Sequence, residues 1–198
     1  MNRLLRTASW SYVAACAVSV AIAWGRSAPQ AEPPTQPAVA VAATPDGAAG
    51  WFQSIKPFCN GVEVEVQLRH NPAPKTLEGA GYEAACYALA GRIDDARRII
   101  DGVSESERYQ AVGVVFNVAH PVADAGDDKA AGPIMQMVVD YWPNHYMALY
   151  HAGMSEYILN QPDLARKHLK SFLEYYSPDD GWRRNAIDVL QRLERGTR

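Results

Sequence analysis

The chain has 198 residues, a formal net charge of −3 and apolar side chains at 48% of its positions. From Trp51 onward, acidic and basic residues are interspersed with a small acidic excess. This balance argues against a nucleic-acid partner, and the length allows one domain with a hydrophobic core once the segments that cannot pack are set aside.

Residues 1–24 are predicted to be a signal anchor or a signal peptide. Arg3 and Arg6 precede an apolar run, residues 8–24, which is about as long as a transmembrane helix needs to be. Ala21 and Ala23 offer a cleavage site, so an uncleaved anchor, which we favour, and a cleaved leader both stay open. A third interpretation makes Cys16 the lipid-modified first residue of a lipoprotein. We expect a single-pass protein of the cell membrane with its domain on the extracytoplasmic side or, after cleavage, a periplasmic or secreted one.

Residues 25–50 are predicted to be a disordered linker. They contain eight Ala and five Pro and almost no bulky apolar side chain. Such a segment cannot bury enough surface to offset the entropy lost on ordering.

Residues 51–76 are interpreted as an N-terminal capping segment. Its residues 62–68 alternate between apolar and polar side chains, as in a strand. A strand needs a partner, however, and Asn60 followed by Glu63 is a helix-capping pair. We therefore favour a helix over residues 60–70, with the strand as the alternative.

From residue 77 onward, apolar positions recur at helical spacing, and Gly, Pro and capping residues divide the pattern into short helices. A period of 34–35 residues runs through this part of the chain. Small residues recur at two equivalent positions of each period: Ala84, Ala119 and Gly153 at the first, and Ala96, Ala131 and Ala165 at the second.

This pattern resembles the tetratricopeptide repeat (TPR), in which small residues lie where the two helices of a hairpin cross. The repeats fall at about 77–111, 112–145 and 146–179, and residues 181–194 resemble the helix that closes such arrays. The resemblance implies an all-α fold of antiparallel helical hairpins stacked as a short right-handed solenoid over residues 77–198. Pro121 and Gly132-Pro133 depart from the pattern, so residues 120–132 are expected to form a loop, with the next helix beginning at Pro133.

The resemblance also implies a concave groove that binds a protein or peptide. Carried over position by position, the residues facing it are Phe116, His120, Met147, Tyr150, Met154 and Tyr157. Aromatic and methionine side chains there would receive an apolar segment. The alternative is that Tyr150 and Tyr157 pack beneath the last helix with Trp182.

The stretch from His120 to Asp128 contains a histidine and three carboxylates, at Asp124, Asp127 and Asp128. These are weak candidates for a Ca²⁺ or similar divalent-cation site, because the spacing is not that of an EF-hand. The alternative is a turn between helices whose aspartates cap the next helix. His145 and His151 are six residues apart and do not share a helix face, so they are not expected to share a metal ion.

Two cysteines, Cys59 and Cys86, lie after the linker and are a possible disulfide in an oxidising compartment, or two buried thiols. The sequence contains no H-x-x-x-H, C-x-x-C or G-x-S-x-G arrangement, so we expect neither enzymatic activity nor a cofactor. The leading hypothesis is a membrane-tethered or exported scaffold or adaptor. The alternatives are a cation-binding or small-ligand-binding domain centred on residues 120–128 and a structural subunit of an envelope complex.

Overall fold

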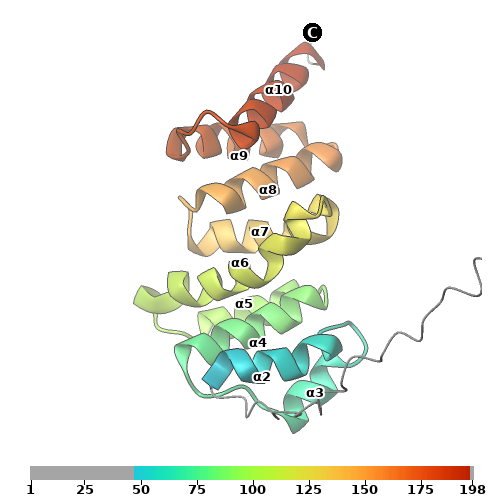
Figure 1. Cartoon of the computed structure of the whole chain (residues 1–198), viewed down its shortest axis with the longest axis vertical. Coiled ribbons are helices and arrows are strands. Elements are labelled where there is room, and N and C mark those ends of the chain that lie inside the picture. The colour runs from blue at the N-terminus through green and yellow to red at the C-terminus, as the bar shows by residue number, and fades with distance from the viewer. Residues whose placement is uncertain (1–46, 197–198) are drawn as a thin grey trace, which may run out of the picture. The chain divides into compact units, whose positions relative to one another are not determined.

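The computed structural model describes residues 47–196, and every regular element within this range is helical (Figure 1). The described part of the chain is therefore all-α. None of its helices is sufficiently long and apolar to cross a bilayer. The predicted signal segment and residues 25–46 of the predicted linker lie outside the described residues.

The first described helix, α2 (Gly47–Ile55), includes the last four residues of the predicted linker, 47–50. Ala48, Phe52 and Ile55 are buried at helical spacing, and the Phe52 ring stacks on Tyr82 with 4.8 Å between centroids. Gly47–Gly50 thus belong to a packed helix. The composition of these four residues did not indicate a helix, because the apolar side chains that pack the helix come mainly from its second half.

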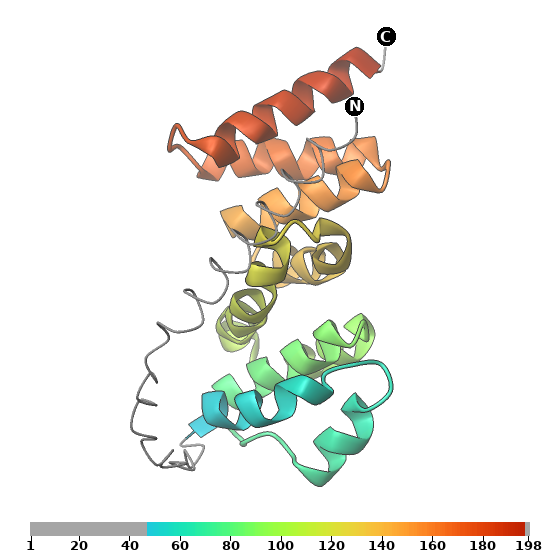
Figure 2. The same cartoon turned by 45° about the vertical axis from the view of Figure 1, so that its right-hand side comes forward.

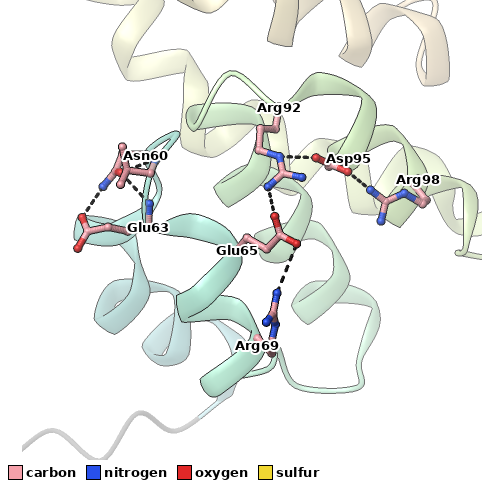
Figure 3. Close-up of polar contacts among 8 residues, drawn as sticks. Asn60, Glu63, Glu65, Arg69, Arg92, Asp95 and Arg98 are labelled. Atoms are coloured by element: carbon pink, nitrogen blue, oxygen red, sulfur yellow. Dashed lines mark hydrogen bonds and ion pairs between the residues drawn. The ribbon is translucent and has the colours of Figure 1, made fainter.

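The helix predicted over residues 60–70 is present over residues 64–70, and residues 60–63 form a bend and turn before it. Asn60 Oδ1 accepts from the backbone N of Glu63 at 3.1 Å, and Asn60 Nδ2 donates to Glu63 Oε2 at 2.8 Å (Figure 3). Regular α-helical geometry starts only after this capping turn, in α3 (Val64–His70), which buries Val64 and Leu68.

An ion-pair chain joins α3 to α5 (Ile93–Asp101). Arg92, directly before α5, donates to Glu65 Oε2 of α3 at 2.8 Å and also pairs with Asp95 (Figure 3). Arg92 lowers the pKa of Glu65, chiefly through that hydrogen bond. These groups are partly exposed, so they orient α3 more than they stabilise the fold.

The remaining helices pack mainly on helices that are close to them in the chain (Figures 1 and 2). α4 packs on α2, α5 and α6, and from α6 to α10 each helix packs on the next. Their bounds are α4 (Leu77–Leu89), α6 (Arg108–Asp124), α7 (Asp128–Tyr141), α8 (Tyr146–Ile158), α9 (Pro162–Tyr175) and α10 (Gly181–Gly196).

Three turns between paired helices are built alike. Gly91, Gly126 and Asn160 each have a positive φ, of 75°, 88° and 57°. At each turn, this residue's N–H donates to the carbonyl three residues back, and the next N–H donates to the carbonyl five residues before itself. Each of these helices therefore ends at a residue in the left-handed backbone conformation. This type of helix end recurs at the 34–35-residue period of the sequence.

All six small residues of the period are buried, as expected. Gly153 shows why one position excludes a larger residue: a Cβ built on it would lie 2.7 Å from Leu169 Cγ and 3.2 Å from Leu169 N. The backbones of α8 and α9 approach closely because this residue lacks a side chain.

The expectation of a loop over residues 120–132 is wrong. Pro121 lies inside the last turn of α6, and Pro133 lies inside α7, so the connection is only residues 125–127. Each proline removes one helical hydrogen bond. Pro121, Pro133, Asn117 and Lys129 are exposed, so water can solvate the carbonyls that lose their donors.

Candidate functional site

A pocket of about 550 Å³ lies between α6 and the turn that leads into α8. One stripe of α6 supplies Gly113, Phe116, Asn117 and His120, which share a face because they are spaced by three and four residues. The turn and the first residues of α8 supply Trp142, Asn144, His145, Tyr146 and Met147. Among these lining residues none is Asp, Glu, Lys or Arg, so the pocket suits an apolar or aromatic group.

Ring packing fixes the pocket wall. The His145 ring contacts Phe116 and Trp142, with centroid distances of 4.0 and 4.6 Å. His145 is also the N-cap of α8, since its Nδ1 accepts from the backbone N of Ala148 at 3.3 Å. Burial lowers the pKa of His145, and an accepting Nδ1 requires the neutral ring. Tyr146, by contrast, is 43% exposed at the rim.

The structure brings three of the six predicted groove residues, Phe116, His120 and Met147, into this pocket. Tyr150 is elsewhere. It is 4% exposed, its ring packs edge-on against Trp182 and Phe172, and its hydroxyl accepts from Asn185 Nδ2 at 2.6 Å.

The expectation that Tyr150 faces an open groove is therefore corrected: α10 covers this part of α8, and Tyr150 belongs to the core. Met154 and Tyr157 are half-buried and pack against the same core, outside the pocket lining. The predicted groove is reduced to its α6 half and the start of α8.

Sequence reasoning missed Trp142, His145 and Tyr146. They lie in or beside the turn between two repeats, where the family pattern assigns no groove position. The available signal was composition, because the six residues from Tyr141 to Tyr146 contain three aromatic side chains and a histidine.

A second cluster begins at His120. His120 Nε2 lies 3.3 Å and His151 Nε2 lies 3.5 Å from the same atom, Oδ1 of Asp124. His151 Nδ1 lies 3.1 Å from Asp128 Oδ1. Burial lowers the pKa of His120, and the Asp124 carboxylate opposes that shift.

Asp127 does not join this cluster. Its Oδ1 accepts from the backbone N of Ala130 at 3.1 Å and caps α7. Of the four weak metal candidates, the structure therefore brings His120, Asp124 and Asp128 together around His151, a residue absent from the predicted set.

The structure joins Cys59 and Cys86 by a disulfide, with 4.8 Å between their Cα atoms. Cys86 lies in α4, and Cys59 follows the 3₁₀ turn Lys56–Phe58 after α2. The bond thus ties the N-terminal helices to the first hairpin.

Comparison with protein-family models, with curated proteins and with solved structures finds no match for this chain. The TPR resemblance therefore remains an interpretation. It depends on the period, on the buried small residues and on the three repeated turns.

Proposed function

We propose that this protein is a TPR-like adaptor, tethered to the cell membrane or exported, which binds a peptide segment of a partner protein. The observation that carries the proposal is the pocket between α6 and α8, whose lining is aromatic and apolar and bears no carboxylate, ammonium or guanidinium group. Concave apolar sites with a few polar groups are the usual form of a binding site.

The occupant we propose is an apolar or aromatic side chain of an extended peptide. Phe116 and Met147 offer apolar area, while Asn117 and Asn144 offer amide groups at the pocket for the peptide backbone. Tyr146 at the rim presents a large ring that loses little conformational entropy on binding.

The proposed location has two supports. Arg3 and Arg6 precede an apolar run, and the described residues contain a disulfide, a bond typical of oxidising compartments. We expect the protein to act by binding and to have no catalytic activity.

Site-specific photo-crosslinking in the native cells tests the proposal. A photoreactive residue at Tyr146 is expected to capture one discrete partner, because this residue lies at the pocket rim. The matched control places it at Tyr175, a 54% exposed tyrosine of α9 outside the pocket lining. Capture of the same proteins from both positions, or of none from Tyr146, contradicts the proposal.

A further inference from the structure

Three potential metal ligands meet where the end of α6 lies against α8. His120 and Asp124 are four residues apart on α6, hence on one helix face, and His151 comes from α8. One ligand atom from each lies within 4.8 Å of the others. The peptide pocket uses neither Asp124 nor His151.

The orientation of His151 is the strongest indication of a ligand. This residue is 1% exposed, and its Nε2 is buried without a hydrogen-bond partner among the described residues. Its Nδ1 lies 3.1 Å from Asp128 Oδ1, so the Nδ1–H donates to that carboxylate and leaves the Nε2 lone pair free. A buried acceptor left unpaired is costly, and a cation would satisfy it.

His120 approaches the same Asp124 carboxylate from the other helix. Its Nε2 is also buried and without a hydrogen-bond partner among the described residues, 3.3 Å from the Asp124 oxygen. The Nε2 atoms of His120 and His151 and one carboxylate oxygen therefore lie close together. The free lone pair of His151 Nε2 faces that oxygen, which is electrostatically unfavourable unless a proton or a metal ion lies between them.

We propose that Nε2 of His120, Nε2 of His151 and the carboxylate of Asp124 bind a divalent transition-metal ion of the Zn²⁺ class. Ligands about 2.0–2.2 Å from a tetrahedral Zn²⁺ are roughly 3.4 Å apart, close to the two nitrogen–oxygen distances of 3.3 and 3.5 Å. Three protein ligands leave one position of a four-coordinate ion for water or another ligand.

Asp128 supports the site from outside the ligand set. Metal-binding histidines commonly donate their second N–H to a carboxylate, which fixes the ring and makes the ligand nitrogen more basic. The Asp128–His151 pair has this form.

This site differs from the oxygen-rich Ca²⁺ site considered from the sequence. Ca²⁺ takes six to eight oxygen ligands, whereas imidazole suits Zn²⁺, Cu²⁺, Ni²⁺ and iron. Asp127 is excluded because it caps α7. The competing explanation is a protonated His151 that forms ion pairs with Asp124 and Asp128.

Zn²⁺ titration of the full chain, purified in detergent and stripped with a chelator, tests the proposal. Calorimetry should show one tight equivalent of Zn²⁺, and Ca²⁺ should bind at least tenfold more weakly. Co²⁺ should give a visible absorption spectrum that Zn²⁺ abolishes. Absence of Zn²⁺ binding, which the ion-pair explanation predicts, or tighter binding of Ca²⁺ overturns the proposal.

Variants locate the ion. Asp124→Asn keeps the size of a partly exposed side chain, and His120→Gln keeps a polar group, so both should retain the helical circular dichroism of the wild type. Each should weaken Zn²⁺ binding at least tenfold, and Asp128→Asn about 10–100-fold. The control is His70→Gln, which removes an exposed histidine of α3. Wild-type affinity in Asp124→Asn and His120→Gln, or lost binding in His70→Gln, overturns the assignment.

Discussion

Gly153 and Leu169 lie so close that a methyl group on Gly153 would be 2.7 Å from Leu169 Cγ. Real Cβ atoms essentially never come this near to another carbon atom, so α8 and α9 pack at a distance that only glycine permits. Replacing Gly153 or Gly113 of α6 by alanine raises helix propensity equally, but only the change at Gly153 crowds a neighbouring helix. Comparing the two variants therefore separates crowding from helix propensity.

Gly113→Ala should stabilise the protein by about 0.5–1 kcal/mol, because alanine favours the helix and the new Cβ would lie 3.4 Å from Trp142, within ordinary contact. Gly153→Ala gains the same propensity but overpacks the crossing, at about 1–3 kcal/mol, so it should be destabilising overall. Denaturant unfolding of both variants measures this difference. Equal stabilisation by both would show that the α8–α9 contact is not crowded.

Removing the disulfide should lower the free energy of unfolding by roughly 3–4 kcal/mol. The bond spans 27 residues, and a loop of this length restricts the unfolded chain by about that amount. The measurement compares Cys59→Ala/Cys86→Ala with Cys16→Ser, a change outside the described residues. Free thiols at Cys59 and Cys86 in protein isolated without reductant would show that the two cysteines do not pair in the cell.

Acid should destabilise the protein through His145. Its pKa in the folded protein is below the ordinary 6.5, so the unfolded chain takes up the proton first. This contribution to stability is complete above about pH 6.5 and is lost as the pH falls through the lower, folded pKa. Protonation also converts Nδ1 from the acceptor that caps α8 into a donor.

His145→Asn provides the comparison, because asparagine caps helices well and does not titrate. In chelator, the unfolding free energy of this variant should fall less between pH 7.5 and pH 5 than that of the wild type. The other titrating groups are common to both proteins and cancel in the difference, apart from the electrostatic interaction of His145 with His120. Identical pH dependence would mean that the pKa of His145 is the same in the folded protein as in the unfolded chain.

Tyr150 should act as a structural residue. Tyr150→Phe removes the hydroxyl that accepts from Asn185 and should cost about 0.5–1.5 kcal/mol of stability, without changing partner binding. A double-mutant cycle with Asn185→Ala measures the coupling, and Tyr175→Phe at an exposed position is the control. Weaker partner binding by Tyr150→Phe at unchanged stability would instead return Tyr150 to the binding surface.

Local signals in the sequence predicted much of the fold. The capping pair Asn60–Glu63 and the small residues of the 34–35-residue period each reflect a nearby physical requirement, and all of them are placed as expected. Gly91 and Gly126 also stood out by their spacing, since left-handed turns favour glycine. The prediction that Pro121 and Pro133 interrupt their helices was wrong. Both prolines lie on exposed helix faces, where water can replace the lost backbone hydrogen bonds.

The candidate site was less predictable because it depends on contacts between distant residues. Tyr150 faces either a groove or the core depending on the position of α10, and the residue spacing within α8 does not determine that position. Likewise, His151 is 31 residues from His120 in the sequence, so helical periodicity could not pair them. Periodicity shows which residues share a face of one helix, but not which faces of two helices meet.

The most direct test of the proposed adaptor role uses the partner segment that crosslinks to a photoreactive residue at position 146. Its Kd is measured for the full-length wild-type protein and for two variants. Met147→Ala truncates a pocket residue, and Tyr175→Ala truncates an exposed one elsewhere. We predict that Met147→Ala raises Kd at least tenfold, about 1.4 kcal/mol, whereas Tyr175→Ala leaves it unchanged, with both variants as helical as the wild type. Wild-type affinity in Met147→Ala, or equal losses in the two variants, would contradict binding in the α6–α8 pocket.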